Sequence, residues 1–94
     1  MKKPLIIIPA FNEEKSIKRV VNNIIENYPQ YDYVVVSDGS KDNTAKICRD
    51  NQYTYLELPI NLGIGGAVQA GYKYALKNGY DIAVQIDGDG QHDV

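Results

Sequence analysis

Residues 5–14 read LIIIPAFNEE, and this stretch sets the first strand and the first turn of the predicted fold. Leu5 to Ile8 is a short apolar run stopped by Pro9, which suits a strand buried on both faces and is too short for a helix. Downstream, apolar residues recur at the spacing of one helix face, namely Ile17, Val20, Val21, Ile24 and Ile25. We expect a helix here, with Asn12 as its N-cap and the two glutamates that follow in its first turn.

Short apolar runs and helical patterns continue to alternate along the rest of the sequence. Further strands are predicted over Tyr33 to Val36, over Tyr53 to Leu58 at an edge of the sheet, and over Ile82 to Ile86. Further helices are predicted over roughly Thr44 to Asp50, capped by Asp42 or Asn43, and from Leu62 to Leu76, closed by Asn78 and Gly79. This order indicates the α/β class, with a mostly parallel sheet of about four strands and helices on both faces.

Size and composition indicate one small folded domain. One core can form from 94 residues, and an apolar fraction of 44% with a charged fraction of 23% is typical of soluble globular proteins. The net charge of −2 provides no basic surface for neutralising phosphates, so we expect no nucleic-acid partner. The single cysteine, Cys48, falls in an apolar helical pattern and is predicted to be a buried structural thiol in a reducing compartment.

The apolar run that follows Met1 to Pro4 is far too short for the hydrophobic region of a signal peptide or for a membrane helix. We therefore expect no membrane segment in this chain, and a location in the cytoplasm or at the cytoplasmic face of a membrane.

Polar residues follow three of the predicted strands at the end where each strand stops. Asn12 and Glu13 follow the first strand, Asp38 follows the second, and Asp87 and Asp89 follow the fourth. Ligands of parallel α/β sheets bind at the carboxyl ends of the strands, so these side chains are expected to meet at one edge.

Asp87 and Asp89 flank Gly88, so both carboxylates can lie in one extended turn. Gln91, two residues after Asp89, adds an amide oxygen. Such oxygen ligands suit a hard divalent cation that also binds substrate phosphates, although a solvated turn explains this short run equally well. An EF-hand calcium loop is excluded because His92 occupies the position that requires glycine. His92 itself is either a ligand or, more in keeping with its place, a turn residue.

The remaining motifs each allow a structural and a functional interpretation. Gly63, Gly65 and Gly66 resemble a phosphate-binding loop, but the third glycine of the dinucleotide fingerprint would fall at Val68, so close packing explains them as well as ligand contact does. Asp38 can accept a hydrogen bond from a nucleobase or form a turn.

Four segments together carry a family resemblance: IPAFNEE (8–14), VVVSDGSKDNT (34–44), NLGIGGAVQAGYKYA (61–75) and IDGDGQHD (86–93). In this order they resemble the family 2 inverting glycosyltransferases, and most of all the branch that is similar to dolichol-phosphate mannose synthase. The resemblance spans nearly the whole chain. It implies a GT-A fold, which is a Rossmann-like three-layer α/β/α arrangement that binds a nucleoside diphosphate sugar together with Mg²⁺ or Mn²⁺.

The resemblance also implies roles for individual positions along the chain. Pro9, Phe11 and Glu13 would line the nucleotide, and Val36 and Asp38 would hold the base. Asp87 and Gly88 would approach the ribose or the sugar. Asp89 and Gln91 would bind the metal, and Asp87 is a further, less strongly supported ligand. A cation there would neutralise charge on the departing diphosphate.

Two positions depart from the family pattern. Ser37 stands where many members carry another acid, which weakens the assignment of base contacts, and Val94 replaces the usual proline after the metal motif. Members also continue for at least another hundred or so residues, which hold the acceptor site and the catalytic base.

Residues 1–94 are therefore expected to be the donor-binding fragment of such an enzyme, inactive alone, with an exposed edge at the fourth strand that favours self-association. The sugar would pass to a lipid phosphate, a polysaccharide or a protein. A non-catalytic nucleotide-binding role is the main alternative. A sugar-phosphate nucleotidyltransferase is less favoured because the loop over residues 9–14 has no glycine and no basic residue.

Overall fold

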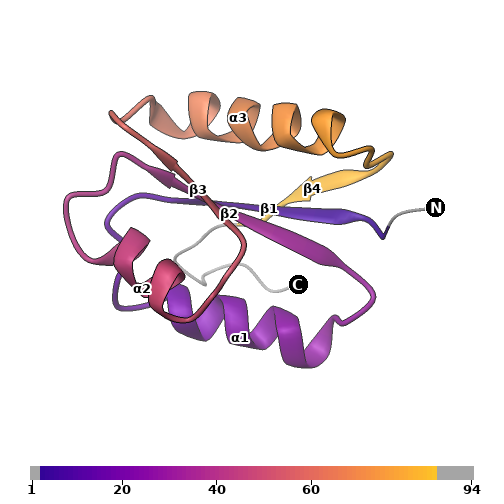
Figure 1. The fold of residues 1–94 in the computed structure, drawn as a ribbon, viewed down its shortest axis with the longest axis horizontal. Helices are drawn as coiled ribbons and strands as arrows, with labels where there is room; N and C mark the ends of the chain where they lie inside the picture. Colours follow the sequence, from indigo (N-terminus) through magenta and orange to yellow (C-terminus); the bar gives the residue numbers. More distant parts are fainter. Residues whose placement is uncertain (1–2, 87–94) are drawn as a thin grey trace.

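The computed structural model describes residues 3–86, in which strands and helices alternate (Figure 1). The order is β1 (Leu5–Ala10), α1 (Ile17–Asn27), β2 (Asp32–Asp38), α2 (Thr44–Asp50), β3 (Tyr55–Leu58), α3 (Gly63–Lys77) and β4 (Ala83–Gln85). The predicted α/β class and its order of elements are confirmed. Within the described range, no helix is both long and apolar enough to cross a membrane.

The strands form one parallel sheet in the order β3-β2-β1-β4. β1 and β2 pair in the centre, from Leu5 beside Asp32 to Ala10 beside Ser37. Alternate residues of β1 enter opposite cores: Ile6 and Ile8 pack on one face, and Leu5 and Ile7 on the other. Double burial explains why this strand is an unbroken apolar run instead of an alternating one.

The helices form the two outer layers. Figure 1 shows α3 alone on one face of the sheet, with α1 and α2 on the other. The buried stripe of α1 runs through Ile17, Val20, Val21 and Ile24, and Ile25 at its margin is 47% exposed. On α3 the buried residues are small, namely Ala67, Gly71 and Ala75, which lets the helix lie close to β1 and β2.

The start of the first helix differs from the prediction. α1 begins at Ile17 with Ser16 at the N-cap position, so neither glutamate lies in its first turn. Asn12 is not the N-cap, because it has a left-handed backbone with φ 54° and lies outside the helix. Asparagine tolerates this conformation better than most residues, since its short polar side chain can form hydrogen bonds nearby.

Other boundaries shift by a few residues. β1 continues through Pro9 to Ala10, and Asp38 is the last residue of β2 instead of the first residue after it. β3 begins at Tyr55 and lies at one edge of the sheet, as predicted. The end of α3 is as expected: Asn78 is its C-cap, and Gly79 follows with φ 79°. β4 forms the opposite edge, and self-association through that edge stays a prediction.

Gly71 controls the distance between α3 and β1, which gives a first prediction. A Cβ atom there would overlap Ile7 Cγ2, and that methyl group cannot swing away because Ile7 is fully buried. We expect Gly71→Ala to lower the free energy of unfolding by about 1–3 kcal/mol in urea denaturation.

The control is Gly65→Ala in the same helix, where a Cβ atom would meet nothing within 4 Å. This change should raise the free energy of unfolding by roughly 0.5–1 kcal/mol, because alanine is the better helix former. Equal effects of the two substitutions would show that the contact with Ile7 does not set the position of the helix.

Cys48 gives a second prediction. Its side chain is fully buried on α2, as predicted, and burial raises the pKa of its thiol from 9.0 to about 11. The thiolate is the reactive form, so the native protein should react with a thiol reagent far more slowly than the urea-unfolded chain at about pH 8. Between pH 9.0 and about 11 the Cys48 thiol ionises in the unfolded chain but not in the native protein. The free energy of unfolding should therefore be unaffected by this group below pH 9.0 and should fall as the pH rises toward about 11. Equal rates in the native and unfolded states would contradict the burial.

Candidate functional site

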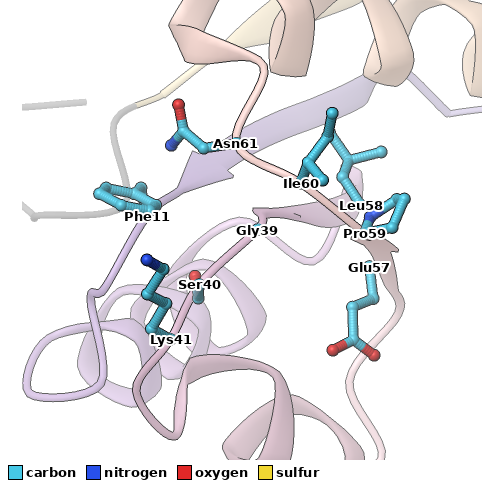
Figure 2. A pocket seen from close by; sticks show the side chains of 9 residues that line it. All are labelled: Phe11, Gly39, Ser40, Lys41, Glu57, Leu58, Pro59, Ile60 and Asn61. Atoms are coloured by element: carbon cyan, nitrogen blue, oxygen red, sulfur yellow. The ribbon is translucent and has the colours of Figure 1, made fainter.

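The candidate site lies where the chain leaves the carboxyl ends of β1, β2 and β3. Because these strands are parallel, the loops over residues 11–16, 39–43 and 59–62 emerge at the same edge of the sheet. These loops enclose a groove of about 690 Å³. It is lined by Phe11, Gly39, Ser40, Lys41, Glu57, Leu58, Pro59, Ile60 and Asn61 (Figure 2).

The groove combines an aromatic surface with a positive charge. Phe11 is 43% exposed, so much of its ring is open to a ligand. Figure 2 shows the ammonium group of Lys41 directed toward the Phe11 ring, with Asn61 beside them, whereas the carboxylate of Glu57 points away from this end of the groove. A planar group can stack on the ring while an anion lies near the lysine.

Asp38 fastens the third of these loops to the end of β2. Its carboxylate Oδ1 accepts a hydrogen bond from the Leu62 N–H at 2.7 Å, and its backbone carbonyl accepts one from Asn61 Nδ2 at 3.2 Å. The residue is only 3% exposed, and Oδ2 accepts no hydrogen bond from residues 3–86. Asp38 therefore has a structural role, but it joins distant segments instead of forming the local turn that the sequence suggested, and its contact with a nucleobase stays a prediction.

Gly39 lies where the backbone after β2 comes close to the backbone of Asn61, and this position requires glycine. It has φ 66°, and a Cβ atom on it would overlap the backbone nitrogen of Asn61. Only glycine fits such a position without moving the backbone. The Asp-Gly pair at the end of β2 thus serves to bring the start of α3 against the end of the sheet.

The first loop is held by side chains of the segment after β2. The N–H of Asn12 donates to Ser40 Oγ at 3.1 Å, that of Glu13 to Thr44 Oγ1 at 2.9 Å, and that of Glu14 to Asp42 Oδ2 at 3.1 Å. In return, Asn12 Oδ1 accepts the Lys41 N–H at 2.8 Å. Phe11 and Lys41, which line the groove, therefore lie on loops that fix each other.

Asp42 is the charged centre of this contact. Besides the Glu14 N–H, it accepts the backbone N–H and the hydroxyl of Thr44 on Oδ1, at 2.9 and 2.5 Å. Burial alone would raise the pKa of Asp42, but the hydrogen bonds from Thr44 and Glu14 outweigh it and hold the pKa below its ordinary value. The predicted capping of α2 is thus provided by Asp42, whereas Asn43 makes no capping hydrogen bond with its side chain.

The other predicted site residues occupy different surroundings. Pro9 and Val36 are partners on neighbouring strands and are buried, so their side chains are not open to a ligand. The carboxylate of Glu13 accepts a hydrogen bond from Ser16 Oγ at 3.1 Å. The predicted residues Asp87, Gly88, Asp89 and Gln91 lie outside the described residues.

Sequence reasoning did not single out Lys41, Ile60 or Asn61 as groove residues. Asn61 stands at the start of the NLG segment, which was the only signal for it. Within residues 3–86, no group of three or more His, Cys, Asp or Glu side chains is placed to hold a metal ion.

Curated relatives match most of this chain. It is 42% identical to the UDP-N-acetylglucosamine–dolichyl-phosphate N-acetylglucosaminyltransferase of Methanococcus voltae, in a match that covers 93% of this chain and 41% of that protein. It is 34% identical to the undecaprenyl-phosphate mannosyltransferase of Micrococcus luteus, over 94% of this chain and 38% of that protein. The chain thus spans about two fifths of the length of these relatives.

Solved structures share the fold. A mannosyltransferase of Pyrobaculum calidifontis in complex with GDP-mannose and Mn²⁺ matches with a TM-score of 0.80 at 26% identity, over 93% of this chain and 27% of that one. TarS of S. aureus in complex with UDP-GlcNAc matches with a TM-score of 0.79 at 25% identity, over 93% of this chain and 26% of that one. The fold is therefore the GT-A glycosyltransferase fold, in the part that this chain covers. The family model for glycosyl transferase family 2 matches residues 5–94, and this chain belongs to that family.

Proposed function

We propose that residues 1–94 form the nucleotide-sugar-binding part of a glycosyltransferase that transfers a sugar, with inversion, from a nucleoside diphosphate sugar to a lipid phosphate. The observation that carries the proposal is the groove at the carboxyl edge of the sheet, with its exposed Phe11 ring and the Lys41 ammonium group, in a chain that matches the family over residues 5–94. Parallel α/β sheets bind ligands at this edge.

The described residues offer distinct contacts for the parts of a nucleotide. The Phe11 ring provides a stacking surface for the base or ribose, and the charge of Lys41 attracts the diphosphate. Asp38 Oδ2 is available to accept a hydrogen bond from a base, while Oδ1 keeps the start of α3 in place. Pro9 and Val36, which the resemblance places near the nucleotide, are paired with each other close to the carboxyl ends of β1 and β2.

The metal is assigned to the run that begins with Asp87. Ile86 leads into this run, and its N–H donates to the Ile7 carbonyl at 2.9 Å, so the chain enters the run from beside the central strand. Asp87, Asp89 and Gln91 supply two carboxylates and an amide oxygen, the hard donors that Mg²⁺ and Mn²⁺ take. A divalent ion held there would neutralise the negative charge on the departing diphosphate.

The acceptor is assigned from the relatives. The names of two of them specify dolichyl phosphate and undecaprenyl phosphate, and both are lipid phosphates. We therefore favour a lipid phosphate over a polysaccharide or a protein, and action at the cytoplasmic face of a membrane. Inversion requires attack on the anomeric carbon opposite the diphosphate, so the donor site must hold that leaving group while its bond to the sugar breaks.

Calorimetric titration of this chain with UDP-, GDP- and dTDP-sugars, with and without Mn²⁺, tests the donor site. One nucleotide class should bind, and Mn²⁺ should strengthen its binding by about tenfold or more, since charge neutralisation contributes at least about 1.4 kcal/mol. If none of the sugars shows metal-dependent binding, this chain does not hold the proposed site.

Asp89→Ala should abolish the effect of Mn²⁺ on this binding. Asp81→Ala is the matched control, because it removes the same charge from an exposed position away from the groove. A metal effect that survives in Asp89→Ala would place the ion elsewhere.

The role of Phe11 is tested separately. Loss of an aromatic stacking surface costs roughly 1–3 kcal/mol per base, so Phe11→Ala should weaken nucleotide binding by about tenfold or more, and Phe11→Tyr should restore it. Tyr72→Ala is the control: Tyr72 is 42% exposed on α3, against 43% for Phe11, but does not line the groove. Equal losses in the two alanine variants would argue against stacking on Phe11.

A further inference from the structure

The loop after β1 has almost no regular structure to hold it. Asn12 is left-handed, and the backbone N–H groups of residues 12–14 serve no strand or helix. All of these consecutive N–H groups nevertheless donate to side chains of one other segment, residues 40–44. Loop N–H groups ordinarily donate to water, and a complete set of partners from one segment fixes the loop in a single conformation.

Thr44 connects this loop to Asp42 through its hydroxyl group. The hydroxyl donates its proton to Asp42 Oδ1, which leaves its oxygen free to accept the Glu13 N–H. A hydroxyl has one proton, so the direction of both hydrogen bonds is set by the carboxylate. Thr44 is fully buried, and water therefore cannot replace its hydroxyl without a rearrangement of the loop.

Asp42 needs both of its oxygens as acceptors. Oδ2 takes the Glu14 N–H, and Oδ1 takes both donors of Thr44. An asparagine side chain presents one oxygen and one NH₂ group. At residue 42, this NH₂ group would face a donor that the carboxylate accepts, either the Glu14 N–H or the donors of Thr44. The contact thus depends on a carboxylate at residue 42 and on a hydroxyl at residue 44.

We propose that Asp42 and Thr44 are positioning residues of the candidate site, which hold the Glu13–Glu14 backbone and thereby keep Phe11 at the edge of the groove. Neither residue is assigned a contact with the nucleotide. Asn12, next to Phe11, is held by Ser40 and Lys41, while Thr44 and Asp42 hold the two residues that follow. Without the bonds to Thr44 and Asp42, half of the loop loses its attachment, and we expect the Phe11 ring to be held less firmly. The effect on nucleotide binding rests on the proposed function, whereas the tether itself does not.

Hydrogen exchange of the backbone amides, followed by NMR, tests the tether directly. In Thr44→Val the side chain keeps its shape but loses the hydroxyl, and exchange at Glu13 and Glu14 should become about tenfold faster than in the parent chain. Asp42→Asn should act in the same way. Thr44→Ser restores a hydroxyl and should return exchange to within about threefold of the parent.

Two controls separate the tether from a general loss of stability. Amides of β1 and β2 report global unfolding, so exchange at Glu13 and Glu14 must rise more than exchange in these strands. Asp50→Asn removes the same charge from the exposed end of α2 and should leave the loop unchanged. A rise confined to the strands, or no rise at all, would overturn the tether.

Titration of the same variants with the nucleotide sugar that the parent chain binds tests the positioning role. Thr44→Val and Asp42→Asn should raise the Kd about tenfold, and Thr44→Ser should restore it. Faster exchange with an unchanged Kd would show that the tether does not position the site. If the parent chain binds no nucleotide sugar, the proposed function fails, and the exchange data alone decide whether the tether exists.

Discussion

The structure depends on the burial of β1 between two layers of helix. Its alternate side chains supply both cores, and every other strand is placed directly or indirectly by pairing with it. α3 presents glycine and alanine to this strand, so the helix axis can lie close enough for Ile7 to fill the gap at Gly71. Because the strands are parallel, the loops that follow them emerge at the same edge of the sheet. The candidate site lies between these loops.

At that edge, hydrogen bonds from side chains to backbone replace regular structure. Asp38 holds the start of α3, and Asp42 and Thr44 hold the loop before α1. Each of these contacts joins segments more than twenty residues apart. The groove lies between the loops that they join, so its shape depends on a few polar side chains and not on packing alone.

The order of elements could be predicted because apolar periodicity is local. The two central strands, β1 and β2, are buried over their own short runs, and α1 carries its own apolar face. The beginning of α1 could not be predicted in this way. Asn12 looks like an N-cap next to two glutamates, but its side chain accepts the Lys41 N–H, and that partner is known only once the sheet has formed. The same is true of Asp42, whose local role as a cap was foreseen and whose distant role was not.

Three acids at the site edge accept hydrogen bonds from other groups of the protein. Asp42 accepts hydrogen bonds on both oxygens, Glu13 accepts one from Ser16, and Asp38 accepts one from the Leu62 backbone. Carboxylates that serve backbone and hydroxyl donors are poor candidates for sharing a cation, because a cation would compete for the same lone pairs. In the proposed donor site, the described residues thus supply the frame and the aromatic surface. This is a further reason why the proposed function leaves the ion to the Asp87–Gln91 run, whose sequence supplies two carboxylates and an amide oxygen.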